Sequence, residues 1–281
     1  MPSDAAGVPH ESAPAFVRGN PIVSAGYDFP TFVGRARPYL LAESPRSGSQ
    51  LLADLLWRTG RMGAPGEYFN REHTIPALTQ RLGLASIDGP GGMDAYIRAL
   101  VRHRTSANGV FGVKAHFSQL RPHLDDPSVR ALVRGSRIVW LRRRDLVAQA
   151  ISYLVALQSD EWRRLRGRDG ATFQGRYSWR DIDRAVGMIA ADERCWQVGF
   201  EQSGITPFVV WYEDLVADPD PACRGICALM GVADGLPPFA LAASPLERQA
   251  DPVKEEWLRR YRQTLDWGPK SPRARSAARA T

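Results

Sequence analysis

Short, continuous apolar runs alternate along the chain with longer segments in which apolar residues recur at helical spacing. The continuous runs are typical of strands buried on both faces of a sheet, and they cover residues 38–44, 109–117, 136–143 and 207–215. The helical patterns cover residues 49–60, 145–162, 181–202 and 252–265. This alternation predicts an α/β fold of three layers, with a central, mostly parallel sheet flanked by helices. Such sheets bind ligands at the carboxyl ends of their strands.

The two ends of the chain differ in composition from the middle. Residues 1–36 are rich in Pro, Gly, Ala and Ser and predict a flexible N-terminal extension, and residues 268–281 predict a flexible basic tail. Residues 37–267 form one predicted domain, long enough to bury a substantial core. No run of about eighteen apolar residues is present, and the N-terminus lacks the pattern of a secretory signal. We therefore expect a cytoplasmic protein with no membrane span.

Cysteine count and charge narrow the classes of function. The chain has three cysteines, a low and odd number that argues against a disulfide framework and suits a reducing compartment. Cys223 and Cys227 are expected to be small core residues, because no histidine or second cysteine pair stands near them. The formal net charge of +7 fits an anionic ligand, a nucleic acid or a membrane surface. No zinc finger, basic zipper or RNA-binding aromatic motif accompanies it, so we expect no nucleic-acid partner.

The most informative segment is LLAESPRSGSQLLADLL, residues 40–56. It predicts a strand that runs directly into a short loop and then a helix, which brings backbone N–H groups and a helix N-terminus to one point. Gly48 permits a tight turn and a close approach of ligand, and an ordinary capped turn is the plainer interpretation. The residues that could bind an anion here are Pro45, Arg46, Ser47, Gly48, Ser49 and Gln50.

The loop lacks the Lys and the first Gly of the Walker A motif, which disfavours the magnesium chemistry of an ATPase. A P-loop-type nucleotide or small-molecule kinase nevertheless remains the alternative function, because kinases share this sheet and phosphate loop. SPRSGS resembles instead the P-[KR]-S-G-[ST] loop of sulfotransferases that use 3'-phosphoadenosine 5'-phosphosulfate (PAPS). That resemblance implies that the loop grips the 5'-phosphosulfate.

Other segments follow in the order expected for this family. They are APGEYFN (64–70), QAISYLVALQSDEWR (149–163), WYEDLVADPDPACRGICALMGV (211–232) and LERQAD (246–251). The chain most resembles the mycobacterial trehalose 2-sulfotransferase subfamily, over residues 38–265. The resemblance implies a P-loop-like fold and sulfuryl transfer from PAPS, without a metal, to a hydroxyl of a small molecule, with PAP as product. The implied acceptor is a trehalose-like carbohydrate, a glycolipid or a natural product, and a homodimer is implied as well.

In this family an Arg at the end of a later strand and a Ser on the next helix bind the 3'-phosphate. The spacing in the most similar subfamily selects Arg143, the common cytosolic spacing selects Arg144, and the downstream Ser is Ser152. Arg248 is implied at the 3'-phosphate end or the rim of the site, although the family's usual R-K-G loop is absent. Glu213 and Asp214 are expected to have a structural role, such as pairing with a basic group or capping.

Sulfuryl transfer requires that the acceptor hydroxyl lose a proton and that positive charge stabilise the transferred and bridging oxygens. The resemblance implies that Glu67 is the general base. His116 is the rival, because classical cytosolic sulfotransferases use a Lys-x-His segment and Lys114 precedes it by two residues. Lys114 and Arg46 are the candidates for the positive charge.

Aromatic residues beside Glu67 suggest where an acceptor binds. Aromatic side chains often stack on sugar faces, but at helical spacing they more often belong to the core. We expect Tyr68 or Phe69 to lie near the acceptor, together with Glu67 and His116, and we expect Trp57 in the core.

Overall fold

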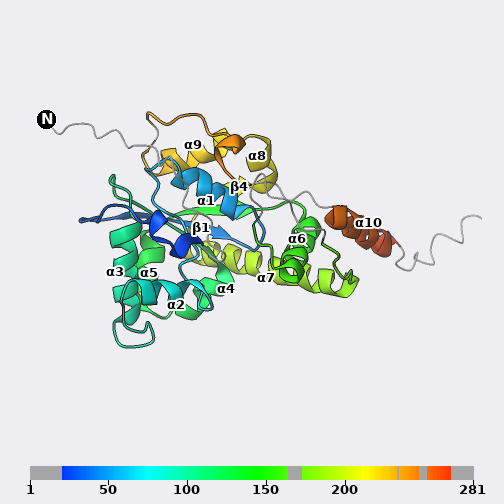
Figure 1. Cartoon of the computed structure of the whole chain (residues 1–281), viewed down its shortest axis with the longest axis horizontal. Coiled ribbons are helices and arrows are strands. Elements are labelled where there is room, and N and C mark those ends of the chain that lie inside the picture. Colours follow the sequence, from blue (N-terminus) through cyan, green and yellow to red (C-terminus); the bar gives the residue numbers. More distant parts are fainter. Residues whose placement is uncertain (1–20, 164–172, 233, 247–251, 267–281) are drawn as a thin grey trace, which may run out of the picture. The chain divides into compact units, whose positions relative to one another are not determined.

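A computed structural model describes residues 21–163, 173–232, 234–246 and 252–266 (Figure 1). The chain divides into two compact units, one of residues 1–144 and 191–245 and the other of residues 145–190 and 246–281. Within the described residues, no helix combines the length and the apolar character needed to cross a bilayer.

The first unit is built on a sheet of four strands, counted over the described residues: β1 (Arg37–Glu43), β2 (Val110–His116), β3 (Arg137–Arg142) and β4 (Phe208–Trp211). The strand order is β2-β1-β3-β4 and every pair is parallel. The register of β1 and β2 places Glu43 beside His116. Polar side chains from two neighbouring strands therefore meet at the carboxyl edge of the sheet.

Helices cover both faces of this sheet (Figure 1). Alternate residues of β1 enter opposite cores, with Tyr39 and Leu41 on one face and Leu40 and Ala42 on the other. The first face is covered by α1 (Ser49–Trp57), α8 (Tyr212–Ala217) and α9 (Pro219–Leu229). The second is covered by α2 (Thr74–Arg81), α3 (Gly92–Arg104), α4 (Phe117–Leu120), α5 (Pro127–Gly135) and the end of α7 (Trp179–Ser203). The predicted α/β fold with a parallel sheet flanked by helices is confirmed.

The second unit contains α6 (Leu146–Ser159), the beginning of α7 and α10 (Pro252–Asp266). Its core is formed by Ile151, Val155, Ile182, Trp257 and Tyr261. The Asp145 carboxylate caps the start of α6 by accepting the Ala148 N–H at 2.8 Å, which satisfies a backbone donor that has no partner within the helix.

The first unit also contains short 3₁₀ turns, which are η1 (Pro21–Val23), η2 (Ala25–Tyr27), η3 (Arg121–His123) and η4 (Leu241–Ala243).

One predicted strand was too long. Residues 207–215 were expected to be extended, but β4 ends at Trp211 and α8 begins at Tyr212. Glu213 and Asp214 lie in the first turn of α8, where the helix dipole favours acidic side chains. The prediction rested on the apolar run alone and did not use these acidic residues, which are typical of the first turn of a helix. Helices α2, α3 and α5 were also not among the predicted elements.

The cysteines and Trp57 lie where they were expected. Cys223 and Cys227 on α9 are fully buried in the core beside the sheet, whereas Cys195 on α7 is exposed. Burial raises the pKa of both core thiols, that of Cys227 to about 12. Trp57 is buried at the end of α1. The prediction that these side chains belong to the core is confirmed.

Candidate active site

The loop between β1 and α1 turns sharply. Ser47 donates its backbone N–H to the Ser44 carbonyl at 3.2 Å, Arg46 has a φ of 65°, and Gly48, the N-cap of α1, has a φ of 93°. A non-glycine residue in the left-handed region is uncommon and costs about 1 kcal/mol or more, so it is maintained by its surroundings. The first N–H groups of a helix have no partner within the helix. The loop and the start of α1 therefore form a site suited to an anion.

An aromatic ring connects this loop to the end of β3. A Cβ atom at Gly48 would lie 2.4 Å from Cδ2 of Tyr212, so the ring packs directly on the glycine backbone. The Arg143 guanidinium lies 4.6 Å from the centroid of the same ring. Tyr212 thus contacts both the loop before α1 and a cation.

The two candidate arginines have different partners. Arg144 forms two hydrogen bonds of 2.8 Å to the Asp214 carboxylate, and its backbone N–H donates to Glu213 at 3.1 Å. The Asp214 hydrogen bonds raise the pKa of Arg144, and the same contact lowers the pKa of Asp214. Arg143 is stacked on Tyr212, and its Nε lies 4.0 Å from Glu213. The acidic pair has the structural role expected of it, because Asp214 pairs with a basic group.

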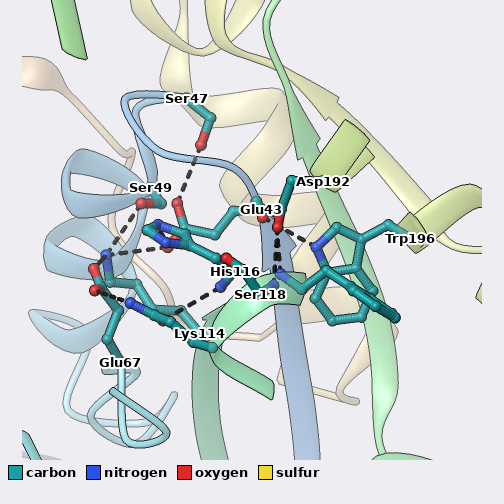
Figure 2. A network of polar contacts seen from close by, with 11 residues as sticks. Glu43, Ser47, Ser49, Glu67, Lys114, His116, Ser118, Asp192 and Trp196 are labelled. Carbon is teal, nitrogen blue, oxygen red and sulfur yellow. Dashed lines mark hydrogen bonds and ion pairs between the residues drawn. The ribbon is translucent and has the colours of Figure 1, made fainter. Parts of the chain in front are cut away.

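Lys114 joins the anion loop to Glu67. Its Nζ donates to Ser49 Oγ at 3.1 Å and to Glu67 Oε1 at 2.7 Å (Figure 2). Glu67 is held beside β2 because the Lys114 backbone N–H donates to the Gly66 carbonyl at 2.9 Å. Gln119 on α4 donates to the other carboxylate oxygen of Glu67 at 2.9 Å. A cation and a carboxylate are thus fixed at the start of α1.

Opposing effects act on the Glu67 carboxyl. Burial is the largest and acts to raise its pKa, but the charges of Lys114 and His116 and the hydrogen bonds from Lys114 and Gln119 together outweigh it. The pKa of Glu67 is therefore held well below its ordinary value of 4.5. The side chain is therefore ionised at neutral pH.

A second carboxylate, Glu43, lies under the loop and is 1% exposed. Its Oε2 accepts the Ser47 hydroxyl at 3.2 Å, and its Oε1 lies 3.3 Å from Lys114 Nζ and 3.7 Å from His116 Nε2 (Figure 2). Trp196 on α7 donates its indole N–H to the Glu43 backbone carbonyl at 3.0 Å. Glu43 therefore contacts the loop, the cation and the histidine at once.

Helix α7 also fixes the segment after His116. The Asp192 carboxylate accepts the backbone N–H groups of Phe117 and Ser118 at 3.1 and 2.9 Å, which satisfies donors at the start of α4 (Figure 2). His116 is the last residue of β2, so its backbone position is determined from both sides.

Glu43, Glu67 and His116 also carry ligand atoms of the kinds that hold metal ions. Across the part of the chain that the structure describes, these three residues offer one atom each within 4.8 Å of one another. The Lys114 ammonium, however, lies 2.7 and 3.3 Å from the two carboxylates. A cation of the protein itself therefore already compensates part of the charge of these carboxylates.

The structure thus brings together the loop, Lys114, Glu67 and His116. Tyr68 and Phe69, expected near the acceptor, have buried side chains, and the Tyr68 hydroxyl donates to the Ala64 carbonyl. Ser152 is buried in α6 of the second unit, and Arg248 lies outside the described residues.

Glu43 and Tyr212 were not assigned to the site from the sequence. The available signal was a lone acid directly after the apolar part of β1, and a Tyr directly after β4.

Comparison with known proteins identifies the class. The Stf0 sulphotransferase family matches residues 38–264 of this chain. Trehalose 2-sulfotransferase of Mycobacterium tuberculosis is 31% identical, with 80% of this chain and 94% of that protein covered. Trehalose 2-sulfotransferase of Mycolicibacterium smegmatis is 29% identical, with the same coverage. A crystal structure of a sulfotransferase from Alicyclobacillus acidocaldarius is similar with a TM-score of 0.43 and 18% identity, covering 83% of this chain and 93% of that one.

The chain belongs to the Stf0 sulphotransferase family, because the family match spans most of its length and the first relative exceeds 30% identity. It is a sulfotransferase, as the resemblance of its loop had indicated.

Proposed function

We propose that this enzyme transfers the sulfuryl group of PAPS to a hydroxyl of a carbohydrate, of the trehalose type. PAPS supplies the sulfuryl group when bound and leaves as PAP. One observation carries the proposal: Lys114 Nζ contacts both Ser49 at the start of α1 and the Glu67 carboxylate. An anion site, a cation and a base are thereby adjacent, which is what sulfuryl transfer requires.

The residues of the site fit the donor. The left-handed Arg46 and Gly48 and the start of α1 suit the 5'-phosphosulfate, with Ser49 and Lys114 as side-chain donors. The Ser47 hydroxyl is directed to Glu43, so that residue contributes to the loop's shape.

Arg143 is proposed for the 3'-phosphate. Its guanidinium stacks on Tyr212, whereas Arg144 is engaged by both oxygens of Asp214. Ser152 and Arg248 stay predictions from the family resemblance.

Glu67 is proposed as the general base. Its ionised carboxylate accepts the proton of the acceptor hydroxyl. Lys114, which contacts Glu67, stabilises the negative charge on the transferred and bridging oxygens. His116 ranks second, because its Nε2 faces the buried Glu43 carboxylate at 3.7 Å.

The proposed acceptor rests on the two relatives, each of which carries the name trehalose 2-sulfotransferase. A sugar hydroxyl fits a site that pairs a carboxylate with a cation. We expect the enzyme to sulfate trehalose or a related saccharide and to leave simple alcohols unmodified.

The donor is tested by titrating PAP and ATP into the protein by calorimetry without magnesium. We expect PAP to bind and ATP to bind weakly. The Arg143→Ala variant should lose at least about tenfold in PAP affinity, since a hydrogen bond to a charged group contributes about 1.5–3 kcal/mol. Arg144→Ala is the matched control and should retain PAP binding. Magnesium-dependent ATP binding without PAP binding would contradict the proposal.

The base and acceptor are tested by mass spectrometry of the products formed from PAPS and a panel of saccharides. Glu67→Gln should lower kcat by roughly 100-fold or more, the usual contribution of a general base. His116→Gln should retain most of the activity. The reverse order of the two variants would assign the proton transfer to His116.

A further inference from the structure

The charged group around Lys114 contains a second acid besides Glu67. Two carboxylates, Glu43 and Glu67, surround one ammonium at 3.3 and 2.7 Å, so this group of three carries one net negative charge. Lys114 is 5% exposed and Glu43 is fully buried at the side chain, so water screens these charges little.

Proton transfer to Glu67 changes this balance. The acceptor's O–H bond breaks, the proton bonds to the Glu67 carboxylate, and Glu67 becomes neutral. The acceptor oxygen uses the freed electron pair to bond to sulfur, while the bond between sulfur and the bridging oxygen breaks and PAP leaves with that electron pair. With Glu43 present, Lys114 still has a carboxylate partner and the group becomes neutral overall. Without Glu43, the same step would remove the second of the two carboxylate charges that lie 3.3 and 2.7 Å from this buried ammonium, which is unfavourable for a buried cation.

The geometry of Glu43 suits this purpose. Among the described residues its Oε1 has no hydrogen-bond partner, although it is buried and lies 3.3 Å from Lys114 Nζ. A buried acceptor without a hydrogen bond is costly and rare. A small movement of the Lys114 ammonium away from Glu67 would give this oxygen a hydrogen bond.

We propose that Glu43 is a positioning residue for sulfuryl transfer, the permanent counter-charge that holds Lys114 in place while Glu67 accepts and releases the proton. This inference rests on the proposed role of Glu67 as base. Glu43 touches neither donor nor acceptor in this scheme and acts through Lys114. A carboxylate under an anion-binding loop is otherwise unexpected, because its charge opposes binding of the anion.

The test is Glu43→Gln, which removes the charge and keeps the size and the hydrogen-bonding capacity toward Ser47. We expect kcat to fall roughly 10- to 100-fold, with the acceptor KM changed by less than about threefold. PAP affinity, measured by calorimetry, should stay equal or increase, because a negative charge near the anion has been removed. A loop damaged by misfolding would weaken PAP binding instead.

Three further variants complete the design. Glu43→Asp keeps the charge and should retain kcat at least in part, and it is the decisive variant if Glu43→Gln does not fold. A folded Glu43→Asp that loses as much kcat as Glu67→Gln, or unchanged activity in a folded Glu43→Gln, overturns the proposal. Glu193→Gln, which removes another buried glutamate paired with Arg142 at 2.9 Å, is the matched control and should leave kcat unchanged. The double variant Glu43→Gln/Glu67→Gln should be no slower than Glu67→Gln alone.

These outcomes separate the two proposals. If Glu67→Gln keeps full activity, or wild-type protein binds no PAP, the proposed function fails. If Glu67→Gln is inactive while Glu43→Gln is as fast as wild type, only the role of Glu43 fails. If the losses in kcat of the two single variants multiply in the double variant, the role of Glu43 is also refuted, because Glu43 would then act independently of the base.

Discussion

Replacing Lys114 by Met tests the electrostatics of the site without any ligand. The substitution removes the ammonium and keeps most of the side chain's length and apolar contact. It leaves the buried Glu43 carboxylate and the partly buried Glu67 carboxylate without the cation that lies 3.3 and 2.7 Å from them. Removing one partner of a buried ion pair usually costs about 3–5 kcal/mol, so we expect a loss of that size in the free energy of unfolding near neutral pH.

The loss should depend on pH in a defined direction. In the wild type, Lys114 keeps the pKa of Glu67 low, so the stability that Glu67 contributes is present above its unfolded value of 4.5 and is lost as the pH falls. In the variant, burial is the dominant effect that remains, and it raises the pKa. A carboxyl with a raised pKa destabilises the fold at high pH and ceases to do so as the pH falls through that pKa.

Urea unfolding followed by tryptophan fluorescence at pH 7.5 and pH 5.5 measures both quantities. The difference between wild type and Lys114→Met should be smaller at pH 5.5 by at least about 1 kcal/mol, since one pKa unit corresponds to about 1.4 kcal/mol. Arg144→Met removes a half-exposed cation from its pair with Asp214 and should give a small loss that is equal at both pH values. An equally large loss at both pH values for Lys114→Met would refute the electrostatic explanation.

Two further predictions concern Gly48 and Glu67. Gly48→Ala places a methyl group 2.4 Å from Tyr212 at a residue with a φ of 93°. We therefore expect the free energy of unfolding, measured in urea, to fall by about 1–3 kcal/mol and PAP binding, measured by calorimetry, to weaken. The control Gly187→Ala, in an open helical position, should be neutral or stabilising. Equal effects of the two changes would contradict the role assigned to the loop. For Glu67→Gln, the difference in unfolding free energy from wild type should be constant between pH 7 and pH 5.5 and should shrink below about pH 4. The reason is that the lowered pKa of Glu67 makes its contribution to stability disappear only in acid. A difference that changed above pH 5.5 would contradict the low pKa.

Much of the fold could be predicted because its signals are local. Continuous apolar runs correctly indicated β1, β2 and β3, and helical spacing correctly indicated α1, α6, α7 and α10. The end of β4 could not be predicted in this way, because Tyr212 continues the apolar run while its ring is required against Gly48. That requirement comes from residues more than 160 positions apart.

The site was predictable in proportion to how much of it is local in sequence. The loop from Ser44 to Gln50 is one continuous segment, so its chemistry was evident. Glu43 was not, because its partners Lys114 and His116 come from a neighbouring strand and meet it only through the register of β1 and β2. Tyr68 and Phe69 show the opposite limit: their aromatic character suggested a sugar site, but the packing of Phe69 with His123 and of Tyr68 with Phe111 buries them in the core.

The burial of two thiols has a practical consequence for measurement. All three cysteines of the chain lie among the described residues, and only Cys195 is exposed. At neutral pH a maleimide dye therefore labels Cys195 alone, without any engineered cysteine. The label would lie on α7, one turn from Asp192 and next to Trp196, whose side chains contact the start of α4 and the end of β1 respectively. The native chain thus allows a fluorescent reporter to be attached beside the site. With this reporter the rate of donor binding and the rate of acceptor binding can be measured separately.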